Sequence, residues 1–205
     1  MKNKIIFKFL MVLGVAFIAG FVNADKNYVH EIIAWQQEMN AEFSNPKETP
    51  LDSVDFSHFK ALAFYPIDIT YRVKAKLVLQ KQSKPFGMKT TTSRLPVYVK
   101  YGKAYFTLKG HKLQINIYQN VEFAKKEKYK DYLFMLFTDL SSGKTSYGGG
   151  RYIDLRKPQQ GDSLIIDFNK AYNPYCAYSH KWSCPIPPAD DHFNIAILAG
   201  IKKWH

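Results

Sequence analysis

Apolar side chains near the start of the sequence recur at steps of three and four residues, with polar residues between them. The apolar positions are Tyr28, Ile32, Trp35, Met39 and Phe43. One face of an α-helix repeats with this period, so the spacing predicts a single amphipathic helix whose apolar stripe packs on the rest of the protein. Pro46 ends the pattern, because proline disfavours helical backbone in the residue before it, Asn45.

From Asp68 onward the period of the apolar positions changes to two. Tyr71, Val73, Ala75 and Leu77 alternate with charged residues, which predicts a long half-buried strand. Further strand-like runs follow at short spacing, at residues 97–101, 104–108, 113–117, 132–137, 151–155, 164–168 and 193–198. The predicted fold class is therefore mainly β: an antiparallel barrel or sandwich of about eight or more strands, with an N-terminal helix packed on one end.

Glycine-containing turns between these runs suggest how the strands connect. Gly102-Lys103 and Lys109-Gly110 are both typical of tight hairpin turns. Runs 151–155 and 164–168 are separated by a connection of hairpin length, so we expect them to pair antiparallel. That pairing would place Arg151 beside the residue that follows the second run, and would bring the flanking loops together as one site.

Residues 1–24 have the composition of a secretory signal peptide. Lys2 and Lys4 precede an apolar stretch, and Val22 and Ala24 are the small residues that signal peptidase requires. An uncleaved membrane anchor is the alternative, because the stretch nearly reaches the ~20 residues that span a bilayer. We expect cleavage after Ala24, export to the periplasm or outside the cell, a single β-rich domain over 25–205, and no transmembrane span after cleavage.

The sequence is basic, with 29 Lys and Arg residues against 17 Asp and Glu residues and a formal net charge of +12. Removal of residues 1–24, which hold three lysines and no acid, leaves +9. Only four of the basic residues are arginine, the residue whose planar fork suits phosphate and base recognition. We therefore expect no nucleic-acid partner. Glycine-rich phosphate loops and zinc-hydrolase motifs are absent from the sequence, so no cofactor is implied.

Four stretches have a more distinctive sequence. Residues 64–73 read Phe-Tyr-Pro-Ile-Asp-Ile-Thr-Tyr-Arg-Val, and residues 147–152 read Tyr-Gly-Gly-Gly-Arg-Tyr. Residues 167–178 read Asp-Phe-Asn-Lys-Ala-Tyr-Asn-Pro-Tyr-Cys-Ala-Tyr, and residues 184–188 read Cys-Pro-Ile-Pro-Pro. The sequence resembles domain-of-unknown-function family 1684 of bacteria and archaea in all four. The resemblance covers the chain from about Trp35 onward and implies little about activity.

Two positions depart from the pattern of this family. Asp190 and Asp191 stand where similar proteins usually have Glu-Asn, and Ile201 stands where they usually have a glutamate after Ala-Gly. If the acid at the position of Ile201 is catalytic in relatives, this protein lacks it.

Cys176 and Cys184 are the only cysteines in the sequence. On a chain bound for an oxidising compartment, the pair favours a disulfide. Adding His180, midway between them, gives three possible metal ligands as the alternative. Zinc sites use closer cysteine pairs and a fourth ligand, so we expect a disulfide and no metal site.

Aromatic and polar residues concentrate in the later motifs. The candidate ligand-binding residues are Tyr147, Arg151, Asn169, Tyr172, Asn173 and Tyr178. Exposed together, they would form a stacking platform for sugars or other flat ligands, with Arg151 as a clamp for an anionic group. Buried, they would pack one end of the barrel, with Arg151 paired to Asp139, Asp154 or Asp167. The sequence leaves both alternatives open.

Three functions fit these residues. The first is a binding module for a small molecule or carbohydrate, with one Tyr/Asn/Arg-lined site. The second is a hydrolytic enzyme that uses Asp139, Asp167 or Asp190 as acid or base near Arg151. The third is a purely structural envelope protein. We rank binding first because the sequence offers neither an activated nucleophile nor a clear metal cluster. An unknown small ligand is the only partner expected, and the sequence predicts no oligomeric state.

Overall fold

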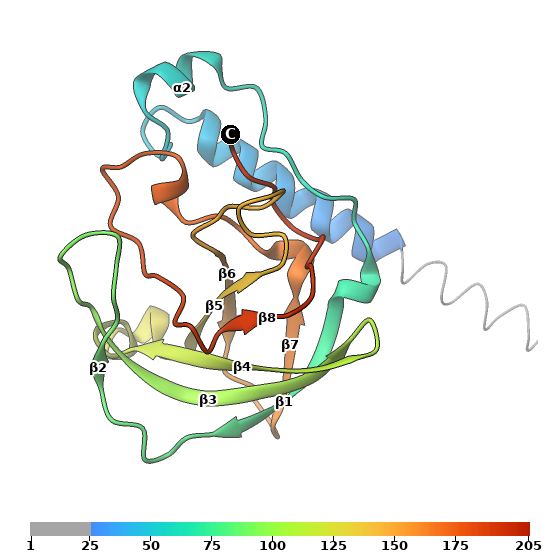
Figure 1. Ribbon diagram of the computed structural model, residues 1–205, viewed down its shortest axis with the longest axis vertical. Helices are drawn as coiled ribbons and strands as arrows, with labels where there is room; N and C mark the ends of the chain where they lie inside the picture. The colour runs from blue at the N-terminus through green and yellow to red at the C-terminus, as the bar shows by residue number, and fades with distance from the viewer. Residues whose placement is uncertain (1–25) are drawn as a thin grey trace, which may run out of the picture.

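The computed structural model describes residues 26–205, and its main feature is an eight-stranded sheet that curls into a half-barrel (Figure 1). The strands along the main path are, in order, β6 (Arg151–Arg156), β5 (Tyr132–Asp139), β4 (His111–Asn120), β3 (Val97–Leu108), β1 (Arg72–Leu79) and β7 (Ser163–Asp167). Off this path, β2 (Phe86–Gly87) pairs with β3, and β8 (His192–Phe193) pairs with β5. Only the β5–β8 contact is parallel among these strands. The predicted fold class, mainly β with about eight strands and an N-terminal helix, is confirmed.

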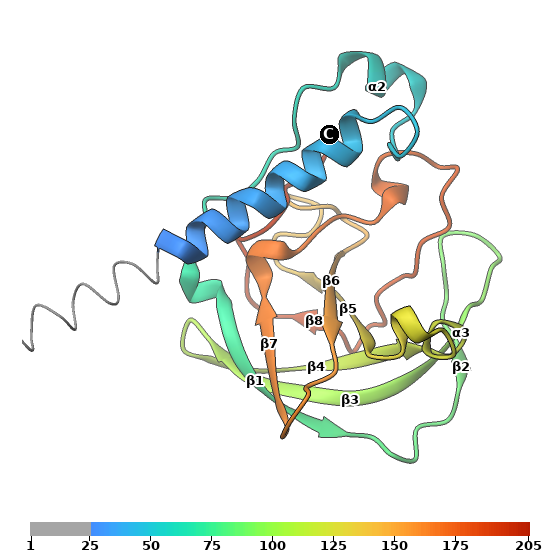
Figure 2. The same ribbon diagram turned by 180° about the vertical axis from the view of Figure 1, so that it is seen from behind.

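The N-terminal helix covers residues 26–44 and lies across one end of the curled sheet (Figure 2). It ends before Asn45, as the sequence predicts. Tyr28, Ile32 and Phe43 of its apolar stripe are buried, whereas Trp35 is only half-buried. The shorter helices are α2 (Ser53–His58), α3 (Val121–Ala124) and the 3-10 turns η1 (Ile69–Tyr71), η2 (Glu127–Tyr129), η3 (Phe168–Lys170) and η4 (Tyr175–Ala177). No helix between residues 26 and 205 has the length and apolar character needed to cross a bilayer. The predicted signal peptide lies outside the described residues.

Strand β5, second in the strand path, is packed on both faces. Leu133, Met135 and Phe137 belong to the main hydrophobic core inside the curl. Phe134 and Leu136 belong to a second cluster, because successive side chains of a strand point to opposite faces of the sheet. Burial on both faces explains why this segment is continuously apolar in the sequence.

One of the two predicted hairpin turns is wrong. β3 continues through Gly102, and its pairing with β4 is shifted by a bulge between Lys100 and Gly102. A Cβ atom at Gly102 would lie 2.7 Å from the carbonyl oxygen of Val78, so glycine here permits close approach of β1 rather than a turn. The hairpin instead joins β3 to β4 at the second predicted turn, where Lys109 and Gly110 both have positive φ.

The predicted hairpin between β6 and β7 is also wrong. These strands lie at opposite ends of the strand path: β6 pairs with β5, and β7 pairs with β1. Their connection, residues 157–162, joins these two strands without a ladder between them (Figure 2), but an isolated antiparallel bridge between Tyr152 and Tyr172 places the start of β6 beside the segment that follows β7. A connection of hairpin length allows two strands to pair, but it does not determine that they pair with each other. Here both strands bury apolar side chains in the main core, and the longer strands β5 and β1 complete that core around them.

Candidate functional site

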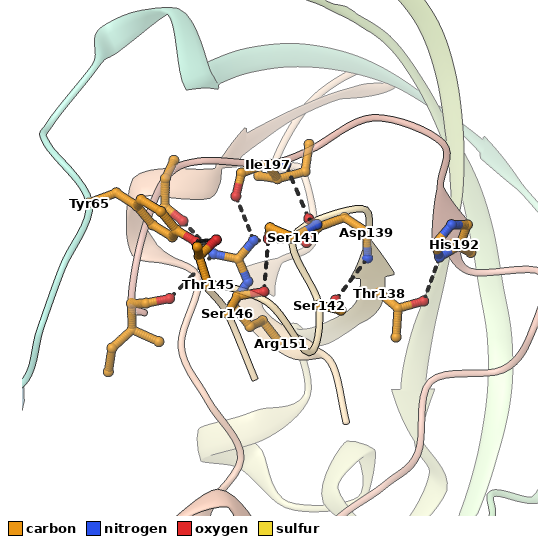
Figure 3. A network of polar contacts seen from close by, with 12 residues as sticks. Tyr65, Thr138, Asp139, Ser141, Ser142, Thr145, Ser146, Arg151, His192 and Ile197 are labelled. Atoms are coloured by element: carbon orange, nitrogen blue, oxygen red, sulfur yellow. Dashed lines mark hydrogen bonds and ion pairs between the residues drawn. The ribbon is translucent and has the colours of Figure 1, made fainter. Parts of the chain in front are cut away.

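The glycine-rich stretch before β6 leads into a buried ion pair (Figure 3). The side chains of Arg151 and Asp139 are both 0% exposed, and Nη2 of Arg151 donates to Oδ2 of Asp139 at 2.8 Å. The guanidinium also donates to the carbonyl oxygens of Ile197, at 2.7 Å, and Ala199, at 2.5 Å. Oδ1 of Asp139 accepts from the backbone amide of Ser141 at 2.7 Å. This pair fixes the C-terminal segment to strands β5 and β6.

The loop after β5 closes around this pair with its own hydrogen bonds. The hydroxyls of Ser141 and Ser146 lie 2.8 Å apart, and the Tyr65 hydroxyl donates to Oγ1 of Thr145 at 2.6 Å (Figure 3). The guanidinium of Arg151 has partners for both of its terminal nitrogens, and only Nε has none. The aspartate pairing that the sequence allowed for Arg151 is therefore made by Asp139, in the interior.

A second buried network holds the N-terminal helix on the end of β7. The Tyr28 hydroxyl donates to the carboxylate of Asp167 at 3.0 Å. The Asn169 amide donates to the Tyr28 hydroxyl at 2.8 Å and to the carbonyl oxygen of Asp68 at 2.9 Å. Asp167 and Asn169 therefore hold together three segments that are distant in the sequence.

The remaining candidates from the motifs lie in different surroundings. Asn173 is buried and donates to the carbonyl oxygen of Lys202 at 2.9 Å. Tyr178 is buried in a third hydrophobic cluster that includes Phe43. Tyr147 is half-buried, and Asp190 is exposed. The motif residues therefore do not converge on one open site, and of the six candidate binding residues only Tyr172 lines a cavity of about 610 Å³.

That cavity, of about 610 Å³, lies against the face of β5 and β6 opposite the main core. The lining side chains come from the N-terminal helix, the β2–β3 connection, the start of β3, the end of β4, α3, β5, β6 and the 172–185 segment. The aromatic members are Trp35, Tyr98, Phe123, Tyr132, Phe134, Tyr152, Tyr172 and Tyr175. A mainly aromatic cavity of this volume with a few polar groups has the form of a small-molecule binding site.

A carboxylate held by two phenols marks the cavity wall. The hydroxyls of Tyr132 and Tyr172 donate to Oδ1 of Asp154 at 2.7 and 2.6 Å. Burial, followed by the negative charge of Asp154, raises the pKa of both phenols far above the usual value, so both remain protonated donors. From another side of the cavity, the Tyr175 hydroxyl donates to the carboxylate of Glu42.

The two cysteines lie next to each other beside this cavity. Both are free thiols in the structure, so the predicted disulfide is not formed in it. The amide of Cys176 donates to Sγ of Cys184 at 3.2 Å. A hydrogen bond from the Cys184 thiol lowers the pKa of Cys176 to about 7, although burial opposes the shift. His180, the third ligand of the metal alternative, is exposed, and residues 26–205 contain no cluster of three potential metal ligands.

Sequence reasoning missed most of the cavity. The sequence motifs suggest Asp154 only as a partner for Arg151, and the helical period suggests Trp35 only as a core residue. One signal could have found part of it: Tyr132 and Phe134 share a face of β5, and Tyr152 and Asp154 share a face of β6. Because the strands pair with Phe134 opposite Asp154, these side chains lie on the same side of the sheet.

The fold and cavity together define a β half-barrel protein with an aromatic cavity outside the barrel core. The family model described as "Protein of unknown function (DUF1684)" matches residues 57–202, and the chain belongs to this family. A solution NMR structure of an uncharacterised protein from Haloarcula marismortui is similar, with a TM-score of 0.68 and 28% sequence identity, over 88% of this chain and 96% of that chain. No curated protein matches the chain.

The family match confirms the resemblance seen in the sequence motifs. It begins after the N-terminal helix, so Trp35, Met39 and Glu42, which form one wall of the cavity, precede the matched residues. Asp191, at a position that departs from the family pattern, is buried: it accepts hydrogen bonds from Asn116 and Tyr118.

Proposed function

We propose that this protein is an exported small-molecule-binding protein whose ligand occupies the aromatic cavity. The observation that carries the proposal is the cavity itself: about 610 Å³, with eight aromatic side chains in its lining. Buried aromatic surface supplies binding energy, and a few fixed polar groups orient the ligand. Carbohydrates and flat organic molecules both suit such a lining.

The binding residues of this proposal differ from the candidates of the sequence motifs. Tyr172 is retained and joins Asp154, Tyr132 and Trp35. In this proposal Arg151 and the buried asparagines position loops around the cavity without touching the ligand.

Hydrolysis receives less support from the geometry than binding does. Asp139 and Asp167 are engaged in separate buried networks. Asp190 is exposed and does not line the cavity. A pair of acids acting on one bond must face the same cleft.

A cavity-filling variant tests the binding proposal. Val97 lines the cavity and is 40% exposed, whereas Val78 is 46% exposed on β1 away from it. A library of neutral sugars, aromatic acids and amines would be screened by ligand-observed NMR. Compounds that bind the wild type and V78W should bind V97W at least about tenfold more weakly, a loss of ~1.4 kcal/mol. The proposal fails if no compound binds, or if V97W binds as well as V78W.

Export is part of the proposal and rests on residues 1–24. Because Val22 and Ala24 suit signal peptidase, exported protein should begin at Asp25. N-terminal sequencing of protein recovered from a bacterial periplasm or medium tests this. A chain beginning at Met1 would contradict it.

The disulfide is proposed for the exported state only. In an oxidising compartment Cys176 and Cys184, which are already adjacent, would pair. Thiol titration of exported protein under denaturing conditions should find no free thiol. Two free thiols per chain would overturn this proposal.

A further inference from the structure

The charged side chains that line the cavity differ in whether an oppositely charged side chain pairs with them. Its four ionisable side chains other than tyrosine and cysteine are Glu42, Arg94, Glu122 and Asp154. Arg94 forms no ion pair with the described residues, but its Nη2 donates to the carbonyl oxygen of Ser183, in the segment after η4, at 2.6 Å. Glu122 is paired with Lys125 at 2.7 Å. Within residues 26–205, neither Glu42 nor Asp154 forms an ion pair.

Tyrosine hydroxyls hold these two carboxylates in place without cancelling their charge. Tyr132 and Tyr172 both donate to Oδ1 of Asp154, and Tyr175 donates to Oε1 of Glu42. The second oxygen of each carboxylate receives no hydrogen bond from the described residues. Each wall therefore keeps an oriented, negatively charged acceptor for a further donor.

The influence of Asp154 reaches well into the cavity. Burial is the main reason that the pKa of Tyr175 lies above its usual value, and the charges of Glu42 and Asp154 add to the increase. The pKa of Tyr98 is raised mainly by burial; the hydrogen bond with Asn120 and the charge of Arg94 oppose this, and the charge of Asp154 makes the smallest contribution to the increase. Three of the four charged side chains of the cavity lining are acidic, although the whole chain carries a formal charge of +12.

Aromatic faces provide the second part of the site. The ring of Tyr152 stands at 89° to Tyr172 and at 72° to Phe134, with centroid separations of 5.8 and 4.8 Å. Because these rings are nearly perpendicular, their faces point in different directions, and we call this arrangement of Tyr152, Tyr172 and Phe134 the aromatic corner. The faces of tyrosine and tryptophan rings attract cations, most strongly where water is excluded.

Resting on the proposed function, we propose that the cavity binds a small organic cation, an amine or quaternary ammonium compound, whose charged head lies between Asp154 and the aromatic corner. Glu42 provides a second carboxylate toward the same ligand. A neutral sugar would leave both carboxylates without a cation, whereas an ammonium group compensates them and contacts the ring faces.

Choline and its neutral isostere 3,3-dimethyl-1-butanol are the probes, with cellobiose as the sugar. Isothermal titration calorimetry of the purified protein should show that choline binds at least about tenfold more tightly than the isostere. D154N keeps an amide oxygen that can accept from Tyr132 and Tyr172 but loses the charge. It should weaken choline binding by about tenfold and leave the isostere unchanged. D162N removes an exposed acid outside the cavity and should bind choline like the wild type.

E42Q is the second variant, and thermal unfolding of each variant checks that it is folded. Equal affinity for choline and the isostere would overturn the inference, as would full choline affinity in D154N and E42Q. If cellobiose or another neutral compound binds and is lost in V97W while choline does not bind, the inference fails and the proposed function stands. If no compound binds, both fail.

Discussion

Two aspartates on neighbouring strands have opposite surroundings. Asp139, on β5, is completely buried and is neutralised by Arg151 and by backbone amides. Asp154, on β6, faces an open cavity, is held by two phenols and forms no ion pair with a described residue. A carboxylate whose partner is part of the chain serves the fold. A carboxylate that is oriented but not neutralised is available to a ligand.

The largest effect is expected where the compensated pair is broken. R151M should lower the free energy of unfolding by about 3–5 kcal/mol, because it leaves the buried carboxylate of Asp139 without its cation. D154N should change it by less than ~1 kcal/mol. Urea unfolding of both variants measures the difference. Similar losses in the two variants would remove the contrast between the two aspartates.

The loop that delivers Arg151 should be nearly as sensitive. Gly150 has a φ of 89°, and a Cβ there would lie 2.6 Å from the carbonyl oxygen of Phe137. G150A should therefore cost about 3 kcal/mol from backbone strain and crowding. Gly110 also has positive φ but has no atom within 4 Å of its Cβ position. G110A therefore introduces backbone strain without crowding and should lower the free energy of unfolding by about 1 kcal/mol. Equal thermal shifts in the two variants would show that crowding at Gly150 is unimportant.

Phenol–carboxylate hydrogen bonds occur in both regions and can be compared directly. Y28F removes a buried donor to Asp167 and also leaves the Asn169 amide without one acceptor, so we expect a loss of about 2 kcal/mol. Y172F removes one of two donors to Asp154 at the more open site and should cost about 1 kcal/mol. Chemical unfolding measures both. A larger loss in Y172F than in Y28F would contradict the assignment of the sealed and open regions.

The smallest effect concerns reactivity rather than stability. In reduced protein, Cys176 should react with iodoacetamide and Cys184 should not, because Cys184 is buried and the pKa of its thiol is raised by its hydrogen bond to Cys176. The thiolate fraction of Cys176 rises with pH, so labelling should be half-maximal near its pKa of about 7. Peptide mass spectrometry identifies the labelled residue. C184A, which removes the thiol donor, should raise the midpoint; an unchanged midpoint would exclude this cause.

Local periodicity was sufficient to predict the elements of the fold. The helix ends before Asn45, and β1 begins at Arg72, one residue into the alternating run, because both patterns reflect which side chains each element buries locally. Pairing was less predictable. Gly102 looks the same in sequence whether it forms a turn or allows two strands to approach, and the partner of β7 is the distant strand β1.

The candidate site was predicted only in part, for a related reason. The motif around Arg151 is contiguous and therefore conspicuous, and its ion pair with Asp139 was one of the alternatives considered. The cavity combines Trp35, Asp154 and Tyr172 from three separate segments. Their proximity depends on strand register and on the position of the helix, which residue spacing does not encode.

The position of β7 has a consequence for how the chain is made. β1 pairs with β3 on one side, but the strand that covers its other edge is synthesised much later. Until then β1 presents unpaired backbone groups, which can recruit another chain and begin aggregation. Lys74 and Lys76, both exposed on β1, disfavour such contacts. A chain truncated before Ser163 would keep that edge open permanently, so the segment from Ser163 onward also protects the first strand from misassembly.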